Sequence, residues 1–288
     1  MDLISFGDSI PEGEYRLHSA FANAINFRRG RIVVSLVPPR AGAGPLNLVV
    51  RQLPPGGARR LRASRFYFYV DENRLRKAPE ALYSSEVPAA PADPEKVQIH
   101  AASLAGSLVR RAPAKSLAFF FDPSLEKNFS RTFDRLLLAR FKKAAACFKS
   151  GKYSAGVKII RGLGFGLTPA GDDFISGLLA GYNYALAALR IDTRRQLEEV
   201  FEHAEGGNLL SNAFMRASYE GKVNAKVRRL LCALTNGPVK EIDPAAAEVM
   251  DCGHTSGADF CAGLLFAVRD SLGEYYHPDG DENDQNRN

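Results

Sequence analysis

A glycine-rich loop that turns into a helix is predicted at Gly162-Leu163-Gly164-Phe165-Gly166-Leu167-Thr168-Pro169-Ala170-Gly171-Asp172-Asp173-Phe174. We expect the Thr168 hydroxyl to cap this helix, because it can accept a hydrogen bond from an amide of the first turn. Pro169 suits the first helical position, where a missing N–H costs nothing. Apolar residues then recur at helical spacing. The adjacent carboxylates of Asp172 and Asp173 are therefore predicted to lie in the first helical turn.

A shorter copy of the pattern lies near the end of the chain, at Gly253-His254-Thr255-Ser256-Gly257-Ala258-Asp259-Phe260. Both copies place a hydroxyl residue, a glycine and an Asp-Phe pair at the start of an apolar helix that contains Gly-Leu-Leu. We expect the two helix starts to converge into one polar site. The candidate catalytic residues are Asp172 and Asp173, and the candidate ligand-binding residues are Gly164, Gly166, Thr168, Gly171, His254, Thr255, Ser256, Gly257 and Asp259.

Two kinds of ligand suit such a site. A helix start attracts anions through its unpaired amides and its partial positive charge, and glycines let the backbone approach them. The carboxylates of Asp172 and Asp173 repel a bare anion, so Mg²⁺ could bridge them to a phosphate. Alternatively, the carboxylates accept hydrogen bonds from an amide or carbamoyl N–H while the helix start holds the acidic end of the same ligand. Mg²⁺ is the one cofactor that these residues suggest.

A purely structural interpretation competes with both. Acidic residues in a first turn stabilise a helix without any ligand. Ser256-x-x-Asp259 is close to a capping box, so a cap and a site are equally good explanations of Asp259. The helical glycines, such as Gly177 and Gly263, are also explained by close helix packing. Two adjacent carboxylates after four glycines exceed what a cap requires, which favours a site at the first copy.

The whole chain is predicted to have an α+β fold. Residues 1–121 form a strand-rich N-terminal domain, with strands at 32–37, 46–50, 65–70 and 117–121 and short helices at 19–25 and 101–111. From Asp122 the apolar pattern becomes helical, which predicts a helical domain over 122–278 that begins with a long helix from Leu125 and packs closely against the first domain. The polar segment 279–288 is predicted to be a disordered tail.

Composition narrows the class of protein. The four scattered cysteines indicate reduced core thiols of a cytoplasmic protein, and we expect neither a signal peptide nor a membrane span. The formal net charge is +6, with much of the basic excess in the first half, for example at Arg59, Arg60 and Arg62. Because no nucleic-acid-binding motif accompanies this charge, an ordinary solvated surface is favoured over nucleic-acid binding.

The two motifs resemble the signatures of a bacterial family with a G-L-T-P-[SA]-G-D-D core, which includes the AllH-type subunit of oxamate carbamoyltransferase. The matching positions are Gly166, Thr168, Gly171, Asp172, Asp173, Thr255, Gly257 and Asp259. The resemblance implies a role in the reaction of oxalurate and phosphate to oxamate and carbamoyl phosphate, in anaerobic allantoin breakdown. It also implies partner subunits, because that enzyme is assembled from three kinds of subunit.

Two alternatives stay open at this point. Clustered aspartates at helix starts also resemble, by analogy only, ADP-ribosylglycohydrolases, so the chain could be a Mg²⁺-dependent hydrolase of a phosphate- or ADP-ribose-containing substrate. It could also be a non-catalytic binding or assembly protein that uses its basic N-terminal half as a docking surface. Metal dependence separates the first alternative from a transferase subunit.

Overall fold

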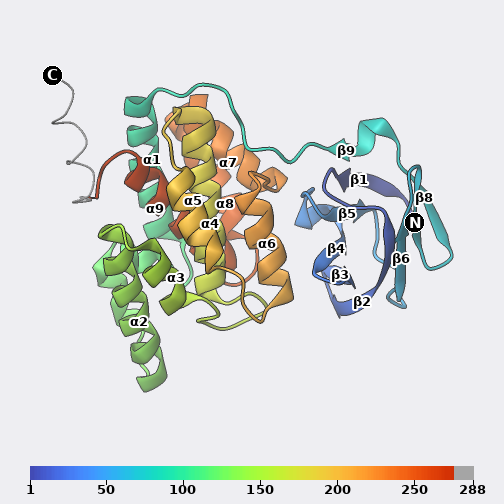
Figure 1. Ribbon diagram of the computed structural model, residues 1–288, viewed down its shortest axis with the longest axis horizontal. Coiled ribbons are helices and arrows are strands. Elements are labelled where there is room, and N and C mark those ends of the chain that lie inside the picture. Colours follow the sequence, from blue (N-terminus) through green and yellow to red (C-terminus); the bar gives the residue numbers. More distant parts are fainter. Residues whose placement is uncertain (276–288) are drawn as a thin grey trace. The chain divides into compact units, whose positions relative to one another are not determined.

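The computed structural model describes residues 1–275, and its contacts divide the chain into two compact units (Figure 1). Unit 1 contains Met1–Val87 and Lys222–Arg229, and unit 2 contains the rest. The first unit is strand-rich and the second is helical, so the predicted α+β class is confirmed. The units divide after Val87, whereas the change in composition lies at Asp122. The predicted tail at 279–288 lies outside the described residues.

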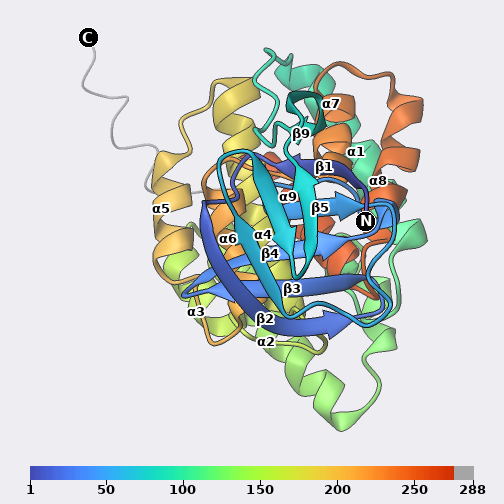
Figure 2. The same ribbon diagram turned by 90° about the vertical axis from the view of Figure 1, so that its right-hand side faces the viewer.

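Unit 1 contains one sheet with the strand order β8-β7-β6-β2-β3-β4-β5-β1-β9. The strands are β1 Leu3–Gly7, β2 Gly13–Phe21, β3 Ala24–Arg29, β4 Ile32–Val37, β5 Asn47–Val50, β6 Arg60–Ala63, β7 Tyr67–Val70, β8 Asn73–Arg76 and β9 Leu82–Tyr83. The sheet curls into a half-barrel (Figure 2). As a result, the rings of Phe6 on β1 and Phe68 on β7 lie 5.5 Å apart, although these strands are near opposite ends of the strand order. Inward residues such as Phe27 and Leu61 alternate with outward polar ones and form the core of this unit.

Two predictions for local structure are wrong. Residues 19–25 form the end of β2 and the start of β3 instead of a helix, since Ile25 must point into the sheet core beside its partner Leu36 on β4. Residues 117–121 form a 3₁₀ helix, Leu117–Phe120, instead of a strand. The Phe120 ring packs edge-on against Phe174 in the helical unit, at 5.2 Å between centroids. Tertiary packing therefore overrides local propensity in both segments.

Unit 2 is built from helices. They are α1 Pro94–Arg111, α2 Thr132–Lys149, α3 Tyr153–Ile160, α4 Ala170–Tyr184, α5 Arg194–Glu202, α6 Leu209–Tyr219, α8 Ile242–Met250 and α9 Ser256–Ser271, while α7, Ala225–Asn236, begins in unit 1 and continues into unit 2. The predicted helix from Leu125 is wrong at its start: a 3₁₀ helix, Pro123–Asn128, comes first and α2 begins at Thr132. A π-helical turn, Ala185–Leu189, follows α4 directly.

Helices α4 and α9 lie side by side in the middle of unit 2 (Figure 1). A Cβ atom on Gly177 would lie 2.1 Å from the Phe260 carbonyl oxygen, and one on Gly263 would lie 2.0 Å from the Phe174 carbonyl oxygen. These contacts are reciprocal, as across a two-fold axis, because each glycine packs on the residue that follows the motif aspartate of the other helix. The helical glycines thus permit close packing, and they place Asp173 and Asp259 at equivalent positions.

A buried carboxylate ties the far end of α9 to α3 and α4. Asp270 Oδ2 accepts a hydrogen bond of 2.7 Å from the Tyr153 hydroxyl and another of 2.7 Å from the Tyr182 hydroxyl. Hydrogen bonds to a charged acceptor are among the stronger ones in a protein interior. This cluster fixes the three helices at the end opposite to the motif aspartates.

Replacing Tyr182 by phenylalanine is expected to lower the free energy of unfolding by about 2 kcal/mol, because a buried hydrogen bond to a carboxylate is lost. Denaturant unfolding measures the change. The matched control is Tyr69→Phe, since the half-buried Tyr69 hydroxyl makes no hydrogen bond within residues 1–275. Equal stability losses in both variants would contradict a specific contribution from the Asp270 cluster.

Two further predictions concern the cysteines and the membrane. Of the four cysteines, Cys261 is buried, Cys147 and Cys252 are half-buried, and Cys232 is exposed. The prediction of core thiols is therefore wrong for all but Cys261. None of the helices in the described part combines the length and the apolar character needed to cross a bilayer.

Candidate functional site

The glycine-rich loop folds back onto the helix that it precedes. The Gly171 amide donates to the Leu163 carbonyl at 2.9 Å, and Gly164 adopts a φ of 125°, which favours glycine. A Cβ on Gly164 would lie 2.6 Å from the Ala170 amide nitrogen, and one on Gly171 would lie 1.9 Å from the Ile160 carbonyl oxygen. These glycines are therefore required for packing the loop between α3 and α4, whether or not a ligand binds.

Thr168 does not cap the helix as predicted. Helix α4 begins at Ala170 after Pro169, and no side chain accepts from its first amides. The helix thus begins one residue later than expected, with Pro169 as the N-cap, so Thr168 lies before the cap. There Thr168 Oγ1 donates to Asp173 Oδ2 at 3.0 Å.

The start of α9 meets the same hydroxyl. Thr168 Oγ1 and Ser256 Oγ lie 3.1 Å apart. Either hydroxyl can be the donor in this contact, and the Ser256 hydroxyl also interacts with the Asp173 carboxyl and lowers its pKa. The structure thus brings the two helix starts together through a chain of hydrogen bonds that runs from Ser256 through Thr168 to Asp173. Both hydroxyl residues are partly exposed, whereas Asp173 is buried.

Asp259 lies at the equivalent position on α9 and is completely buried, with 0% exposure. Its Oδ1 atom accepts a hydrogen bond of 2.7 Å from the Leu117 amide, and within residues 1–275 no hydrogen bond of standard geometry reaches its Oδ2 atom. Burial raises the pKa of this carboxyl to about 7. The hydroxyl of Thr255, the residue before α9, interacts with the same carboxyl and opposes this rise in pKa. The predicted capping box of Ser256 and Asp259 does not form, because Thr255 is the N-cap of α9 and Asp259 accepts from the Leu117 amide.

The other two carboxyls are buried as well, and they face different partners. Burial raises the pKa of Asp173 well above its usual range, and the neighbouring charge of Asp259 raises it further. Asp172 accepts a hydrogen bond of 2.6 Å from the Gly162 amide, and burial raises its pKa. Asp172 therefore closes the glycine loop, while Asp173 and Asp259 form the acidic pair at the junction of α4 and α9.

Sequence reasoning missed two groups that complete the surroundings of the aspartates. The Leu117 amide holds Asp259, and no motif marks it because its segment reads as a strand. The buried hydroxyl of Ser211 on α6 lies near Asp172 and lowers the pKa of that carboxyl. The signal that points to Ser211 is the polar start of α6, where Asn208 caps the helix and its amide group donates to the Leu167 carbonyl at 2.6 Å.

The backbone amides at the helix starts are mostly occupied. The amides of Asp172 and Asp173 donate to the Pro169 carbonyl at 2.9 and 3.1 Å, and the Gly257 amide donates to the Cys252 carbonyl at 3.0 Å. These amides do not point at open space, so they cannot receive an anion. The junction instead presents carboxylate and hydroxyl oxygens, which suit ligand groups that donate hydrogen bonds.

A comparison with known families bears on this junction. The family model described as oxamate carbamoyltransferase subunit AllH matches residues 160–268. The chain carries an AllH-type segment. The resemblance predicted from the two motifs is thereby confirmed, although the matched segment is less than half of the chain. No curated relative and no solved structure matches this chain.

The AllH-type segment begins at the last residue of α3 and ends within α9, so it contains both motifs and the acidic pair. It does not include the Leu117 amide that holds Asp259. His254, a predicted site residue, lies in this segment but is exposed, and its ring has no hydrogen bond within the described residues. Among residues 1–275, no group of three or more His, Cys, Asp or Glu side chains is arranged to hold a metal ion.

The loop of the AllH-type segment also carries apolar side chains on its outside. Phe165 and Leu167 are 64% and 56% exposed, respectively. The Phe165 ring contacts that of Phe133 on α2, at 5.5 Å between centroids, and Phe133 is itself exposed. Neighbouring exposed aromatic residues of this kind are typical of surfaces that another chain covers.

Proposed function

We propose that this chain is a subunit of a carbamoyltransferase that converts oxalurate and phosphate to oxamate and carbamoyl phosphate. The AllH match supports the role of a subunit related to this enzyme. The acidic pair of Asp173 and Asp259 supports binding of a small ligand that carries N–H groups. Oxalurate and oxamate both carry amide N–H groups beside a carboxylate.

The observation that carries the proposal is the completely buried carboxyl of Asp259, whose Oδ2 atom receives no hydrogen bond of standard geometry within residues 1–275. A buried acceptor without a donor costs about 1–3 kcal/mol, and more when it is charged. A protein retains such a group where a ligand or a shared proton completes it. Asp173, whose pKa is raised in part by the charge of Asp259, is the neighbouring group that can share that proton.

The chemistry of the reaction suits this arrangement. An oxygen of hydrogen phosphate forms a bond to the carbamoyl carbon of oxalurate, and the bond from that carbon to the inner nitrogen breaks. The proton that the phosphate gives up is the one that the leaving nitrogen of oxamate gains. The hydroxyls of Ser256 and Thr168 connect the partly exposed surface to Asp173, so they provide a path by which the buried carboxyls relay this proton.

The proposal includes partner subunits and a cytoplasmic location. The exposed side chains of Phe165, Leu167 and Phe133 surround the loop beside the junction and support its coverage by another chain. The second chain would complete the site and supply the groups that bind phosphate, since the amides at the two helix starts are already occupied.

Differential scanning fluorimetry of the full chain tests the ligand class. Oxamate, oxalurate, carbamoyl phosphate, phosphate and ADP-ribose are each added with and without Mg²⁺. Oxamate or oxalurate is expected to raise the melting temperature of the wild type, and Asp173→Asn is expected to abolish this shift. A ligand at a hundred times its Kd stabilises the native state by about 2.7 kcal/mol, which is readily measured.

The matched control is Asp192→Asn, which changes an exposed aspartate outside the junction and should leave the shift intact. A shift that requires both Mg²⁺ and ADP-ribose would instead support a hydrolase. The same measurements are made on the complex obtained by co-expression with the other subunits of an oxamate carbamoyltransferase. Absence of any shift in both the chain and that complex would contradict the proposal.

A further inference from the structure

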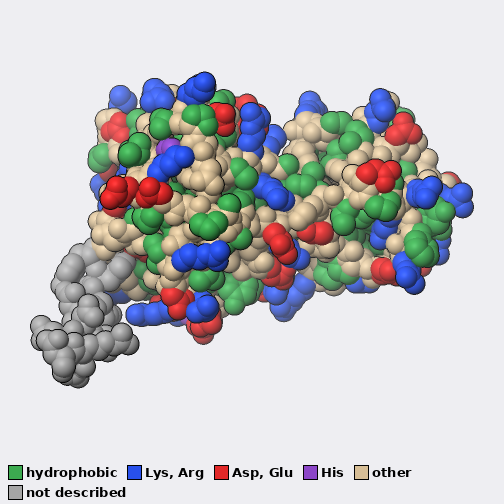
Figure 3. Space-filling model, turned by 90° about the horizontal axis from the view of Figure 1, so that it is seen from above, with side chains coloured by type: hydrophobic (Ala, Val, Ile, Leu, Met, Phe, Trp, Pro, Cys, Tyr) green, Lys and Arg blue, Asp and Glu red, His purple; other side chains and the backbone are tan. Residues whose placement is uncertain are grey.

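The outer face of the sheet in unit 1 carries a dense group of arginines, far from the AllH-type segment in sequence. Exposed arginines on β2, β3, β6 and β8 alternate with residues of the sheet core, such as Tyr15, Leu61 and Leu75. We call this group the arginine face, and its members are Arg16, Arg28, Arg60, Arg62, Arg74 and Arg76. Figure 3 shows exposed Lys and Arg side chains on the strand-rich unit.

The strand register places these arginines next to one another. Arg16 on β2 is directly opposite Arg28 on β3 and directly opposite Arg60 on β6, so three positive side chains form one row across three strands. In the next row Arg62 lies opposite Glu14 on one side and Tyr69 on the other. Directly opposed like charges destabilise a sheet, which indicates that the row serves something other than stability.

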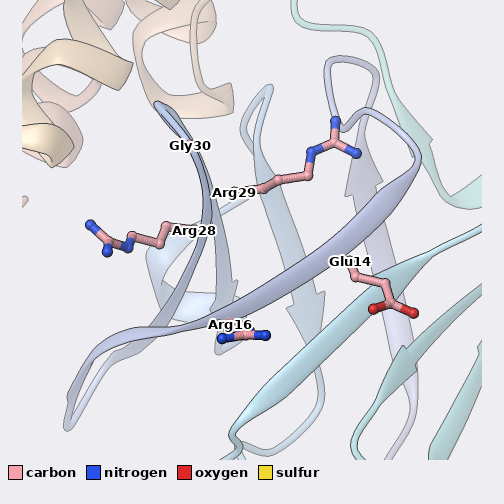
Figure 4. Close-up of a pocket in the computed structure, with 5 residues that line it drawn as sticks. All are labelled: Glu14, Arg16, Arg28, Arg29 and Gly30. Carbon is pink, nitrogen blue, oxygen red and sulfur yellow. The ribbon is translucent and has the colours of Figure 1, made fainter.

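Few acidic side chains accompany the arginine face. Within residues 1–275, none of its arginines forms an ion pair, and the carboxylates in its two rows are Glu14 and Asp71, which accepts from the Arg60 amide at 2.9 Å. Arg29, the neighbour of Arg28 on β3, points the opposite way and donates to the Glu12 carbonyl (Figure 4). A hollow of about 370 Å³ lies beside Glu14, Arg16 and Arg28.

Tyrosines hold part of the face in place. The Arg62 guanidinium lies 4.0 Å from the centroid of the Tyr69 ring, and that of Arg74 lies 4.9 Å from the centroid of the Tyr67 ring. Stacking on a ring restricts a long side chain while leaving the edge of the guanidinium free to donate two parallel hydrogen bonds. Less conformational entropy is then lost when a carboxylate binds.

We propose that the arginine face is a docking surface for an acidic segment of a partner protein, bound through its carboxylates. Charge complementarity carries the choice of an acidic partner, because the six arginines outnumber the carboxylates of Glu14 and Asp71 and none of the six forms an ion pair within residues 1–275. The docking surface is independent of the function proposed above, since it lies outside the residues that match the AllH family.

The stacked tyrosines favour a protein over a single-stranded nucleic acid. Binding of single strands relies on aromatic rings on which bases stack. Here guanidinium groups already cover the rings of Tyr67 and Tyr69. The face therefore offers oriented donors for carboxylates, with few uncovered rings for bases.

Fluorescence anisotropy on the full chain tests this proposal, with labelled poly-glutamate and labelled oligo(dT) of equal length as probes. The wild type is expected to bind poly-glutamate more tightly than oligo(dT), and the affinity is expected to fall as salt is added. Arg16→Ser/Arg60→Ser is expected to weaken poly-glutamate binding at least about tenfold, because two charge-assisted contacts are lost. Melting curves verify that this variant is folded.

Two further variants make the result specific. Arg135→Ser/Arg140→Ser removes the same charge from exposed positions on α2 and is expected to leave binding unchanged. Arg16→Lys/Arg60→Lys keeps the charge but loses the guanidinium fork, and it is expected to bind with intermediate affinity. Equal losses in the two serine variants, or tighter binding of oligo(dT) through the same arginines, would overturn the proposal.

Discussion

Replacing Gly263 by alanine is expected to lower the free energy of unfolding by about 3 kcal/mol or more, although alanine is the better helix former. The added Cβ would lie 2.0 Å from the Phe174 carbonyl oxygen and 2.9 Å from the Leu178 amide nitrogen. Both atoms belong to the backbone of α4 and cannot rotate away, so the two helices must separate. Separation exposes the apolar surface between the two helices to water. This surface includes the side chains of Leu178 and Leu264, which are completely buried.

The reciprocal packing of α4 and α9 predicts an equal result at the other glycine. Gly177→Ala places its Cβ 2.1 Å from the Phe260 carbonyl oxygen and 2.8 Å from the Leu264 amide nitrogen. Because one movement of the helices relieves both clashes, the double variant is expected to be less destabilised than the sum of the single variants. Strict additivity would contradict the view that the two glycines serve one helix crossing.

Gly207→Ala is the matched control for these variants. A Cβ on Gly207 meets no atom within 4 Å, and its backbone does not require a positive φ. Its stability is expected to change by no more than about 0.5 kcal/mol. Denaturant unfolding of the wild type and the four variants measures these changes, and the dependence of the unfolding free energy on denaturant concentration is compared among them. A loss of stability in Gly207→Ala as large as in Gly263→Ala would show that glycine content, and not the helix crossing, decides stability.

The two motif helices could be predicted because their signals are local. Apolar spacing marks α4 and α9, and the adjacent carboxylates fall in the first turn of α4 as expected. The fold class also follows from local signals, since the run Ile32–Val37 gives β4 and the pattern beyond Asp122 gives helices. Period and composition are sufficient for elements of this kind.

The contacts of the site could not be predicted, because they depend on residues far apart in the chain. Asp259 reads as a capping residue from its own neighbours, but its partner is the Leu117 amide. The segment around Leu117 reads as a strand, and it forms a 3₁₀ helix because its aromatic rings pack against the helical unit. Likewise Thr168 has the sequence of a cap, and its role as the link between Asp173 and Ser256 appears only once α4 and α9 meet.

The acidic pair predicts a dependence of stability on pH that Asp259→Asn should remove. The carboxyl titrates near pH 3.9 in the unfolded chain. In the folded chain its pKa is raised to about 7. Between these two values the folded state binds more protons than the unfolded state, so stability falls as pH rises. The free energy of unfolding changes by at most about 1.4 kcal/mol per pH unit in this range. The dependence disappears below the pKa of the unfolded chain and above the pKa of the folded chain.

Asparagine at this position has no proton to lose, so the variant gains stability relative to the wild type as the pH rises from 4 to 7. The expected gain is about 3–4 kcal/mol, which is the three-unit difference in pKa converted at about 1.4 kcal/mol per unit. Removing the charge of Asp259 also lowers the pKa of Asp173, which flattens the remaining pH dependence. Denaturant unfolding at several pH values measures the difference between the two proteins.

Asp251→Asn provides the control for this measurement. Asp251 is an exposed carboxylate in the turn between α8 and α9, so its removal should leave the pH profile of the wild type unchanged. Parallel profiles for the wild type and Asp259→Asn would mean that Asp259 is ionised at neutral pH in the folded chain. The buried Asp259 carboxyl would then carry a full charge, which would contradict the shared proton proposed for the acidic pair. If the dependence of the unfolding free energy on pH flattens only in Asp259→Asn, the Asp259 carboxyl takes up a proton on folding. This result would support the proposed proton relay through the acidic pair.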